Sequence, residues 1–290
     1  MFGASMHSQM NALLNAMFDR VQTAVVVHRG TGHGSIPENS SGAVRAALAS
    51  GGDMVEIDVT GSTDNYYFAF HDGYEAERLG LFNQNLQGLP AHEIRELSYV
   101  WHDRPGRRAP VEPLSEVLGK FRGDTLFSVD RSWWRWPSLL LALDSLRMPR
   151  QILLKCPSWE FDAIERLQAH STKYPFMPIC GSVEEADRVL ALDQLNLVGL
   201  ELITHTSESP WFDPDVIAGY HAKGLFLLVN TVTLTTGIPL FGGLEDEQAV
   251  LGSPDEVWGP IFDLGFDAIQ TDWPWLLRDY RERRRAEGRT

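Results

Sequence analysis

Cysteines, basic residues and long apolar runs are scarce in this chain of 290 residues. Its two cysteines, Cys156 and Cys180, are too few for a disulfide framework, so we expect packing thiols and a reducing compartment, the cytoplasm. Acidic residues outnumber basic ones by 39 to 25, and the net charge of −14 argues against nucleic acid as a partner. No apolar run reaches the roughly 18 residues of a membrane span, and residues 1–20 lack the basic start of a signal peptide. We therefore expect no stable membrane association.

Apolar strands and amphipathic helices alternate along the chain. Strands are expected to begin near residues 24, 54, 125, 151, 176, 197, 225 and 267, each followed by a helix. Eight such units predict a (β/α)8 TIM barrel, in which chemistry lies at the C-terminal ends of the strands. We expect one domain over residues 1–290, with a small polar insertion at about 73–110 and an N-terminal helix closing the bottom of the barrel.

The second predicted strand carries two carboxylates on one face. Glu56 and Asp58 are two positions apart, so both point to the same side, whereas the residues between and beside them are apolar. Residues 61–65 are turn formers and too few for a crossover helix, which predicts an antiparallel return strand, a β-hairpin arm. Folding about residues 63 and 64 sets position 71 roughly opposite position 56. His71 is thereby brought back to the carboxylates.

A third carboxylate, Asp130, ends the strand expected beside this one. Three carboxylates on two neighbouring strands make an all-oxygen site for a hard divalent cation, Mg²⁺ or Ca²⁺, with Mn²⁺ also suitable. No His or Cys pair has the spacing of zinc ligands. His28, at the end of the first strand, and His71 flank this site. Two histidines beside a metal-bound anion suit acid–base or nucleophilic chemistry at phosphorus.

Five short motifs carry a family resemblance: His28-Arg29-Gly30, Pro37-Glu38-Asn39, Glu56-Ile57-Asp58-Val59, His71-Asp72 and Thr271-Asp272-Trp273-Pro274. In order and spacing they resemble the HRG, PEN, E-x-D-V, HD and TD-x-P motifs of the glycerophosphodiester phosphodiesterase family, over about residues 24–275. The resemblance implies a TIM barrel with an insertion after His71 and the activity of a phosphoric diester hydrolase. It also implies a catalytic pair His28 and His71, metal ligands Glu56 and Asp58, and a phosphate contact from Arg29.

The chain departs from the family pattern on the third strand. The family usually has E-I-K there, whereas this chain has Asp130-Arg131-Ser132. Asp130 can still ligate a metal, with a side chain one carbon shorter. Lys155, ending the next strand, either supplies the charge of the missing lysine or forms a salt bridge at the barrel rim. The family W-T-V-N is replaced by residues 229–232. These changes surround the substrate, so they bear on specificity more than on reaction type.

Several tryptophans follow predicted strand ends, where loops face a substrate: Trp133, Trp134, Trp136, Trp159, Trp211 and Trp273. Their flat apolar faces suit a sugar ring or a choline headgroup, or else they only cover the barrel mouth. We expect Trp133, Trp134 and Trp273 to bind substrate. Glu201 and Asn230, at late strand ends, are candidates for sugar hydroxyls, although Glu201 has the alternative of pairing only with Lys155.

The sequence thus predicts a metal-dependent enzyme that cleaves a small-molecule glycerophosphodiester or sugar phosphodiester, for example of the agrocinopine type, to an alcohol or sugar and a phosphomonoester. One alternative is a lyase that releases a cyclic phosphate, similar to the sphingomyelinase D toxins, although those are secreted and disulfide-bonded. The other is a non-catalytic sugar-phosphate binding protein, motivated by the missing lysine and opposed by the retained histidines and carboxylates. The choice of substrate, the metal and the oligomeric state stay open at this point.

Overall fold

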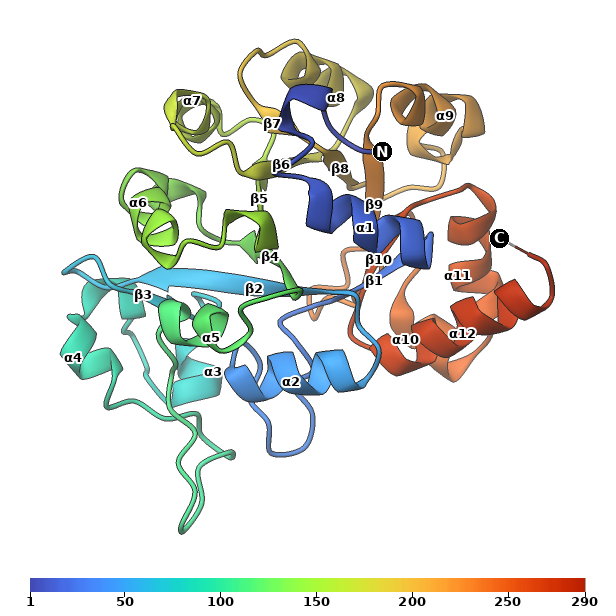
Figure 1. Ribbon diagram of the computed structural model, residues 1–290. Helices are drawn as coiled ribbons and strands as arrows, with labels where there is room; N and C mark the ends of the chain where they lie inside the picture. Colours follow the sequence, from blue (N-terminus) through green and yellow to red (C-terminus); the bar gives the residue numbers. More distant parts are fainter. Residues whose placement is uncertain (290) are drawn as a thin grey trace.

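Eight parallel strands close into a barrel in the computed structural model, which describes residues 1–289 (Figure 1). Around the ring they are β1 (Ala24–Val27), β2 (Met54–Gly61), β4 (Leu126–Asp130), β5 (Ile152–Pro157), β6 (Pro175–Cys180), β8 (Gly199–Leu202), β9 (Phe226–Asn230) and β10 (Ala268–Thr271). A short additional strand, β7 (Asn196–Leu197), also pairs with β6. Because β1 pairs with both β10 and β2, the ring is closed, and the predicted TIM barrel is confirmed.

Helices surround the barrel: α2 (Ser41–Ala49), α5 (Leu114–Lys120), α6 (Trp136–Leu146), α7 (Phe161–Ala169), α8 (Val183–Leu190), α9 (Pro214–Ala222), α11 (Pro254–Asp263) and α12 (Pro274–Ala286). Local chemistry sets their ends. Ser40, for example, caps α2 by accepting a hydrogen bond from the backbone N–H of Ala43 at 3.1 Å. The predicted helices are all present, and a short helix that was not predicted, α10 (Asp246–Leu251), precedes α11.

One end of the barrel is closed by the N-terminal helix α1 (Ala12–Val21), which crosses it in Figure 1. Leu14, Met17 and Phe18 are buried in one apolar cluster with residues near the start of the barrel strands, such as Met54 and Leu126. Burial of this apolar face explains why the helix forms there. The predicted bottom closure is confirmed, and the C-terminal ends of the strands are left as the mouth.

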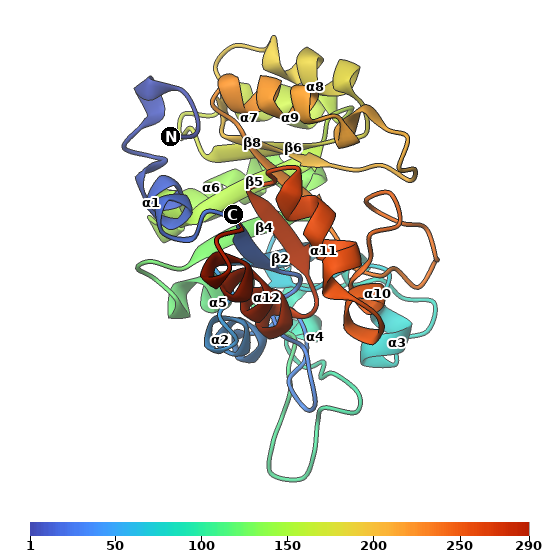
Figure 2. The ribbon, with the colours of Figure 1, turned by 90° about the vertical axis from the view of Figure 1, so that its right-hand side faces the viewer.

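The hairpin arm and the insertion flank the mouth (Figures 1 and 2). Strand β3 (Tyr67–Ala69) pairs antiparallel with β2, and the hairpin prediction is confirmed. The insertion that follows contains α3 (Glu75–Leu79), a 3-10 turn (Leu86–Gly88) and α4 (Ala91–Ile94). It has an apolar cluster of its own, formed by Phe68, Phe70, Leu79, Leu86, Ala91, Ile94, Tyr99, Ala109 and Val111.

Several residues with ambiguous sequence roles belong to the core. Cys156 and Cys180 are buried free thiols, which confirms them as packing residues. Trp136 and Trp211 are fully buried, so the expectation that they face a substrate is wrong. Trp136 packs edge-on against Phe176 because its helix folds back onto the barrel. Within residues 1–289, no helix combines the length and apolar character needed to cross a bilayer.

Candidate active site

Three carboxylates meet at the mouth of the barrel. The β2–β4 register places Asp58 directly opposite Asp130, with Glu56 two positions earlier on the same face as Asp58. One oxygen from each of the three lies within 4.8 Å of the others. Among the residues that the structure describes, the Oε1 atom of Glu56 is buried without a hydrogen-bond partner. A hard cation bound by oxygen ligands would satisfy that atom, so the residues present fit a divalent metal.

The first two motifs hold the carboxylates in place. The backbone N–H of Arg29 donates to Glu56 Oε2 at 2.7 Å. Asn39 Nδ2 donates to Asp58 Oδ2 at 2.9 Å, and Asn39 Oδ1 accepts from the Asp58 N–H at 3.0 Å. Gly30 adopts a left-handed backbone with φ of 67°, and a Cβ there would lie 2.8 Å from the Ala43 carbonyl carbon. This close approach packs the first motif against the first turn of α2.

Burial and neighbouring charges shift the pKa values of the two carboxylates on β2 in opposite directions. Burial, reinforced by the charge of Asp58, raises the pKa of Glu56 well above its ordinary value. Burial would also raise the pKa of Asp58, but Arg29, whose Nε lies 3.1 Å from Asp58 Oδ2, lowers it below its ordinary value. Glu56 therefore tends to keep a proton until a cation neutralises the site.

Lys155, Glu201 and Asn230 lie below the mouth and are buried. Lys155 Nζ is 2.9 Å from Asp130 Oδ2 and 2.9 Å from Glu201 Oε2, so it forms the salt bridge that the sequence left open. Asn230 Oδ1 accepts a hydrogen bond from the backbone N–H of Val232 at 3.0 Å. None of the three lines the pocket described below, and their contacts with substrate stay predictions.

The two histidines are both anchored through Nδ1. His28 Nδ1 lies 2.9 Å from Asp272 Oδ1, and His71 Nδ1 lies 2.7 Å from the carbonyl oxygen of Asp72. An Nδ1–H donor to each oxygen leaves Nε2 available for proton transfer. Burial alone would lower the pKa of His28, but the carboxylate of Asp272 raises it above its ordinary value.

His71 returns to β2 with a register one residue away from the predicted one. Val59 faces Ala69, so position 57, rather than 56, would face position 71 if the ladder continued. The cause is the turn, which Ser62 closes by donating its N–H to the Tyr66 carbonyl at 2.8 Å and thereby centres on residue 64.

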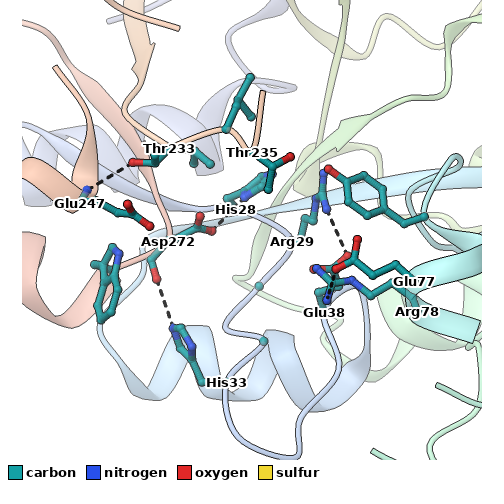
Figure 3. A pocket seen from close by; sticks show the side chains of 16 residues that line it. His28, Arg29, His33, Glu38, Glu77, Arg78, Thr233, Thr235, Glu247 and Asp272 are labelled. Carbon is teal, nitrogen blue, oxygen red and sulfur yellow. Dashed lines mark hydrogen bonds and ion pairs between the residues drawn. The ribbon is translucent and has the colours of Figure 1, made fainter. Parts of the chain in front are cut away.

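A cavity of about 300 Å³ opens beside His28 and Arg29 (Figure 3). In Figure 3, Thr233, Glu247 and Asp272 lie on one side of it and Glu38, Glu77 and Arg78 on the other. Thr235, Tyr74 and Trp273 also line the cavity. The insertion therefore contributes directly to the pocket. Of the three tryptophans predicted to bind substrate, Trp273 lines it, whereas Trp133 and Trp134 lie outside it, in a 3-10 turn (Trp133–Arg135) after β4. Hydroxyl and carboxylate groups beside an indole suit a polyhydroxylated alcohol.

Sequence reasoning missed Asp246, the first residue of α10. Its carboxylate is 1% exposed and accepts hydrogen bonds from Thr231 Oγ1 at 2.6 Å, Thr271 Oγ1 at 2.8 Å and Trp258 Nε1 at 3.1 Å. It also accepts from the backbone N–H of Asp272 at 2.9 Å. Burial raises its pKa to about 6 despite these donors. No motif marks Asp246, because its partners come from separate parts of the sequence.

Residues 28–134 match the glycerophosphoryl diester phosphodiesterase family, and this segment contains both histidines and all three carboxylates. The predicted family and a phosphodiesterase enzyme are thereby confirmed. Residues 176–281 match a second family, described as a domain of unknown function. No curated protein matches the chain.

Solved structures of glycerophosphodiester phosphodiesterases share the fold. The enzyme from Agrobacterium tumefaciens is 22% identical, with a TM-score of 0.65 over 90% of this chain and 99% of that one. An Oleispira antarctica phosphodiesterase, solved with the product sn-glycerol-3-phosphate, is 18% identical, with a TM-score of 0.66 over 92% and 99% of the two chains. The Thermotoga maritima enzyme is 18% identical, with a TM-score of 0.61 over 89% and 98%.

Proposed function

We propose that this chain is a metal-dependent hydrolase of a small glycerophosphodiester or sugar phosphodiester, which it cleaves to an alcohol or sugar and a phosphomonoester. The observation that carries the proposal is the set Glu56, Asp58 and Asp130, with an unsatisfied buried oxygen, beside two histidines anchored through Nδ1. The family match of residues 28–134 supports the same reaction class.

The carboxylates would hold one divalent cation, Mg²⁺ or Ca²⁺, or alternatively Mn²⁺, which supplies positive charge to the phosphate oxygens when bound. The Nε2 atom of one histidine takes a proton from the attacking hydroxyl or water, and that of the other gives a proton to the leaving alkoxide. Asp272 keeps His28 in the tautomer with a free Nε2. Arg29 borders the pocket and is the proposed phosphate contact of the HRG motif.

One of the two alcohol groups of the diester fits the pocket between Thr233 and Arg78. Thr233, Thr235 and Glu247 offer hydrogen bonds to hydroxyls, and the indole of Trp273 offers a flat face for a sugar ring. Glycerol would use only part of this wall, which favours a sugar phosphodiester of the agrocinopine type.

A phosphodiester screen with product analysis tests the proposal. The purified protein is incubated with glycerophosphocholine, a sugar phosphodiester and an aryl phosphodiester, with Mg²⁺, Mn²⁺ or Ca²⁺ or after chelation, and products are identified by phosphorus NMR. A phosphomonoester formed only with added metal supports the proposal. A cyclic phosphate as end product indicates the lyase instead, and binding of sugar phosphates without turnover of any diester indicates a binding protein.

A further inference from the structure

Most of the cations around the carboxylates are already neutralised. Lys155 is 1% exposed and lies between Asp130 and Glu201. Arg29 pairs with Glu38 and Asp58, and its guanidinium lies over the Tyr74 ring at 4.8 Å. Lys155 therefore has no accessible edge, and the charge of Arg29 is already balanced by two carboxylates.

Arg78, the other arginine of the pocket wall, is similarly occupied. Its Nη2 atom lies 3.2 Å from Glu38 Oε2, and its Nη1 atom lies 3.3 Å from Glu77 Oε1. Both terminal nitrogens of this guanidinium therefore face carboxylates. Excess negative charge beside them disfavours an anionic phosphate group at that wall.

Arg131 differs from these three cations. It directly follows Asp130, and its backbone N–H donates to Asp130 Oδ1 at 2.7 Å. Its side chain is 35% exposed, and its guanidinium donates through Nε and Nη2 to a single oxygen, Asp72 Oδ1, at 3.3 and 3.2 Å. Within residues 1–289 the guanidinium makes no other ion pair. The Nη1 atom therefore has no carboxylate partner, and the guanidinium is held beside Asp72, the residue that follows His71.

The neighbours of Arg131 fix its position. Its guanidinium carbon lies 5.5 Å from the ring centre of Trp134 and 5.9 Å from that of Trp133, within the range of cation–π contacts. The next residue, Ser132, occupies the place of the family lysine but is fully buried, and its Oγ accepts from Trp136 Nε1 at 3.0 Å. Ser132 thus belongs to the core and leaves the lysine's charge unreplaced at its own position.

We propose that Arg131 is the substrate-binding cation that replaces the missing lysine, and that it contacts the phosphate of the diester through its free Nη1 edge. The proposal rests on the proposed function. A planar guanidinium is suited to phosphate oxygens because it offers two parallel N–H donors. The pair Trp133 and Trp134 then supports this arginine rather than stacking on a sugar.

Phosphate binding tests the proposal separately from catalysis. Inorganic phosphate is titrated into the Mg²⁺-loaded protein by calorimetry, for the wild type and for Arg131→Met, Arg131→Lys and Lys155→Met. An exposed insertion arginine provides the matched control, Arg104→Met. Arg131→Met is expected to weaken phosphate binding about tenfold or more, as loss of a charge-assisted contact does, and to raise KM for an aryl phosphodiester similarly. Arg131→Lys should recover part of the affinity, and Arg104→Met should leave it within about twofold.

Unchanged phosphate affinity and KM in Arg131→Met would overturn the inference, as would a loss in Lys155→Met without one in Arg131→Met. Thermal unfolding and Mg²⁺ titration of each variant verify the fold and the metal site. If Arg131→Met does not fold, Arg131→Lys provides the test. Its phosphate affinity is then expected to be about threefold below that of the wild type, and an unchanged affinity would count against the proposal. If no diester is hydrolysed but phosphate binds in an Arg131-dependent way, the proposed function fails and this inference stands.

Discussion

Two individual residues turn the chain at the carboxylate site. Arg29 lies two residues after the end of β1 and Arg131 directly follows β4, the strands on either side of β2, and both have left-handed backbones, with φ of 53° and 49°. Such conformations cost an L-residue roughly 1 to 2 kcal/mol and occur at functional sites more often than elsewhere. Each of these residues comes immediately after a site residue, His28 or Asp130, and its turn leaves that side chain at the mouth.

The histidine pair makes a sharp kinetic prediction. His28→Ala and His71→Ala should each nearly abolish kcat, because one proton donor and one acceptor are required in the same step. The double variant should be little worse than either single variant, since the pair acts as a unit. Steady-state rates on an aryl phosphodiester measure this, with the exposed His92→Ala as control. Losses that multiply in the double variant would contradict the paired mechanism.

The His28–Asp272 contact predicts a pH-dependent contribution to stability. The pKa of His28 is raised above its ordinary value of 6.5, against the effect of burial, by the carboxylate of Asp272. A raised folded-state pKa stabilises the fold fully below the unfolded pKa, and this contribution is lost as the pH rises through the folded value.

The free energy of unfolding should therefore fall in Asp272→Asn, and the deficit should shrink with rising pH above about 6.5. Denaturant unfolding between about pH 5 and pH 9 measures the difference between the two proteins. A deficit that grows with pH over this range would show that the pair does not raise the pKa of His28. The conservative variant Asp267→Asn, at the residue before β10, whose carboxylate pairs with His221, provides a comparison.

At the scale of elements, the strand pairs were predictable and the loop contacts were not. Alternation along β2 places Glu56 and Asp58 on one face, and the parallel order of β2 and β4 then brings Asp130 beside them. The burial of Trp136 and Trp211 depends on how a helix and a 3-10 turn pack back onto the barrel. Residues adjacent in sequence do not determine that packing. Asp246 joins β9, β10 and α11 through side chains far apart in sequence.

The role of Asp246 as a junction between elements is testable by Asp246→Asn. An amide presents an N–H₂ group to at least one of the donors from Thr231, Thr271 or Asp272, so a buried hydrogen bond is lost. The fold should be destabilised by roughly 1 to 3 kcal/mol. Because Asp246 holds the backbone N–H of Asp272, the variant should also displace the Asp272 carboxylate from His28. The pKa of His28 should then fall, and one limb of the kcat–pH profile should move toward lower pH. An unchanged profile would limit Asp246 to stability alone.

The pocket walls, formed by the insertion and the loop after β9, predict a substrate preference. A sugar phosphodiester should have a kcat/KM about tenfold or more above that of glycerophosphocholine, from stacking and hydrogen bonds worth roughly 1 to 3 kcal/mol together. Trp273→Ala should erase most of this preference and spare a small aryl phosphodiester. Trp159→Ala, at an exposed position outside the pocket, should preserve it. Glycerophosphocholine as the better substrate, with Trp273→Ala without effect, would favour the plain glycerophosphodiester activity.

The whole molecule combines a net charge of −14 with three carboxylates in one buried site. Burial and Asp58 raise the pKa of Glu56 above its ordinary value of 4.5. Above that pH the unfolded chain loses the Glu56 proton, whereas the metal-free folded protein retains it. The free energy of unfolding of the metal-free protein therefore falls as pH rises. A bound cation replaces the proton and removes this penalty. Metal binding and folding stability should therefore be linked, and more strongly at higher pH.

Mg²⁺ should accordingly raise the melting temperature, and by more at pH 8 than at pH 6. At a Mg²⁺ concentration about a hundredfold above its dissociation constant the gain is about 2.7 kcal/mol, or roughly 5 to 10 °C for a domain of this size. Scanning calorimetry with and without Mg²⁺ at the two pH values measures it. Glu56→Gln should abolish most of the shift, because the amide cannot replace the carboxylate, whereas Asp144→Asn, a helix carboxylate that pairs with Tyr174, should keep it. A shift that survives in Glu56→Gln, or that is larger at pH 6, would place the cation somewhere other than at these three carboxylates.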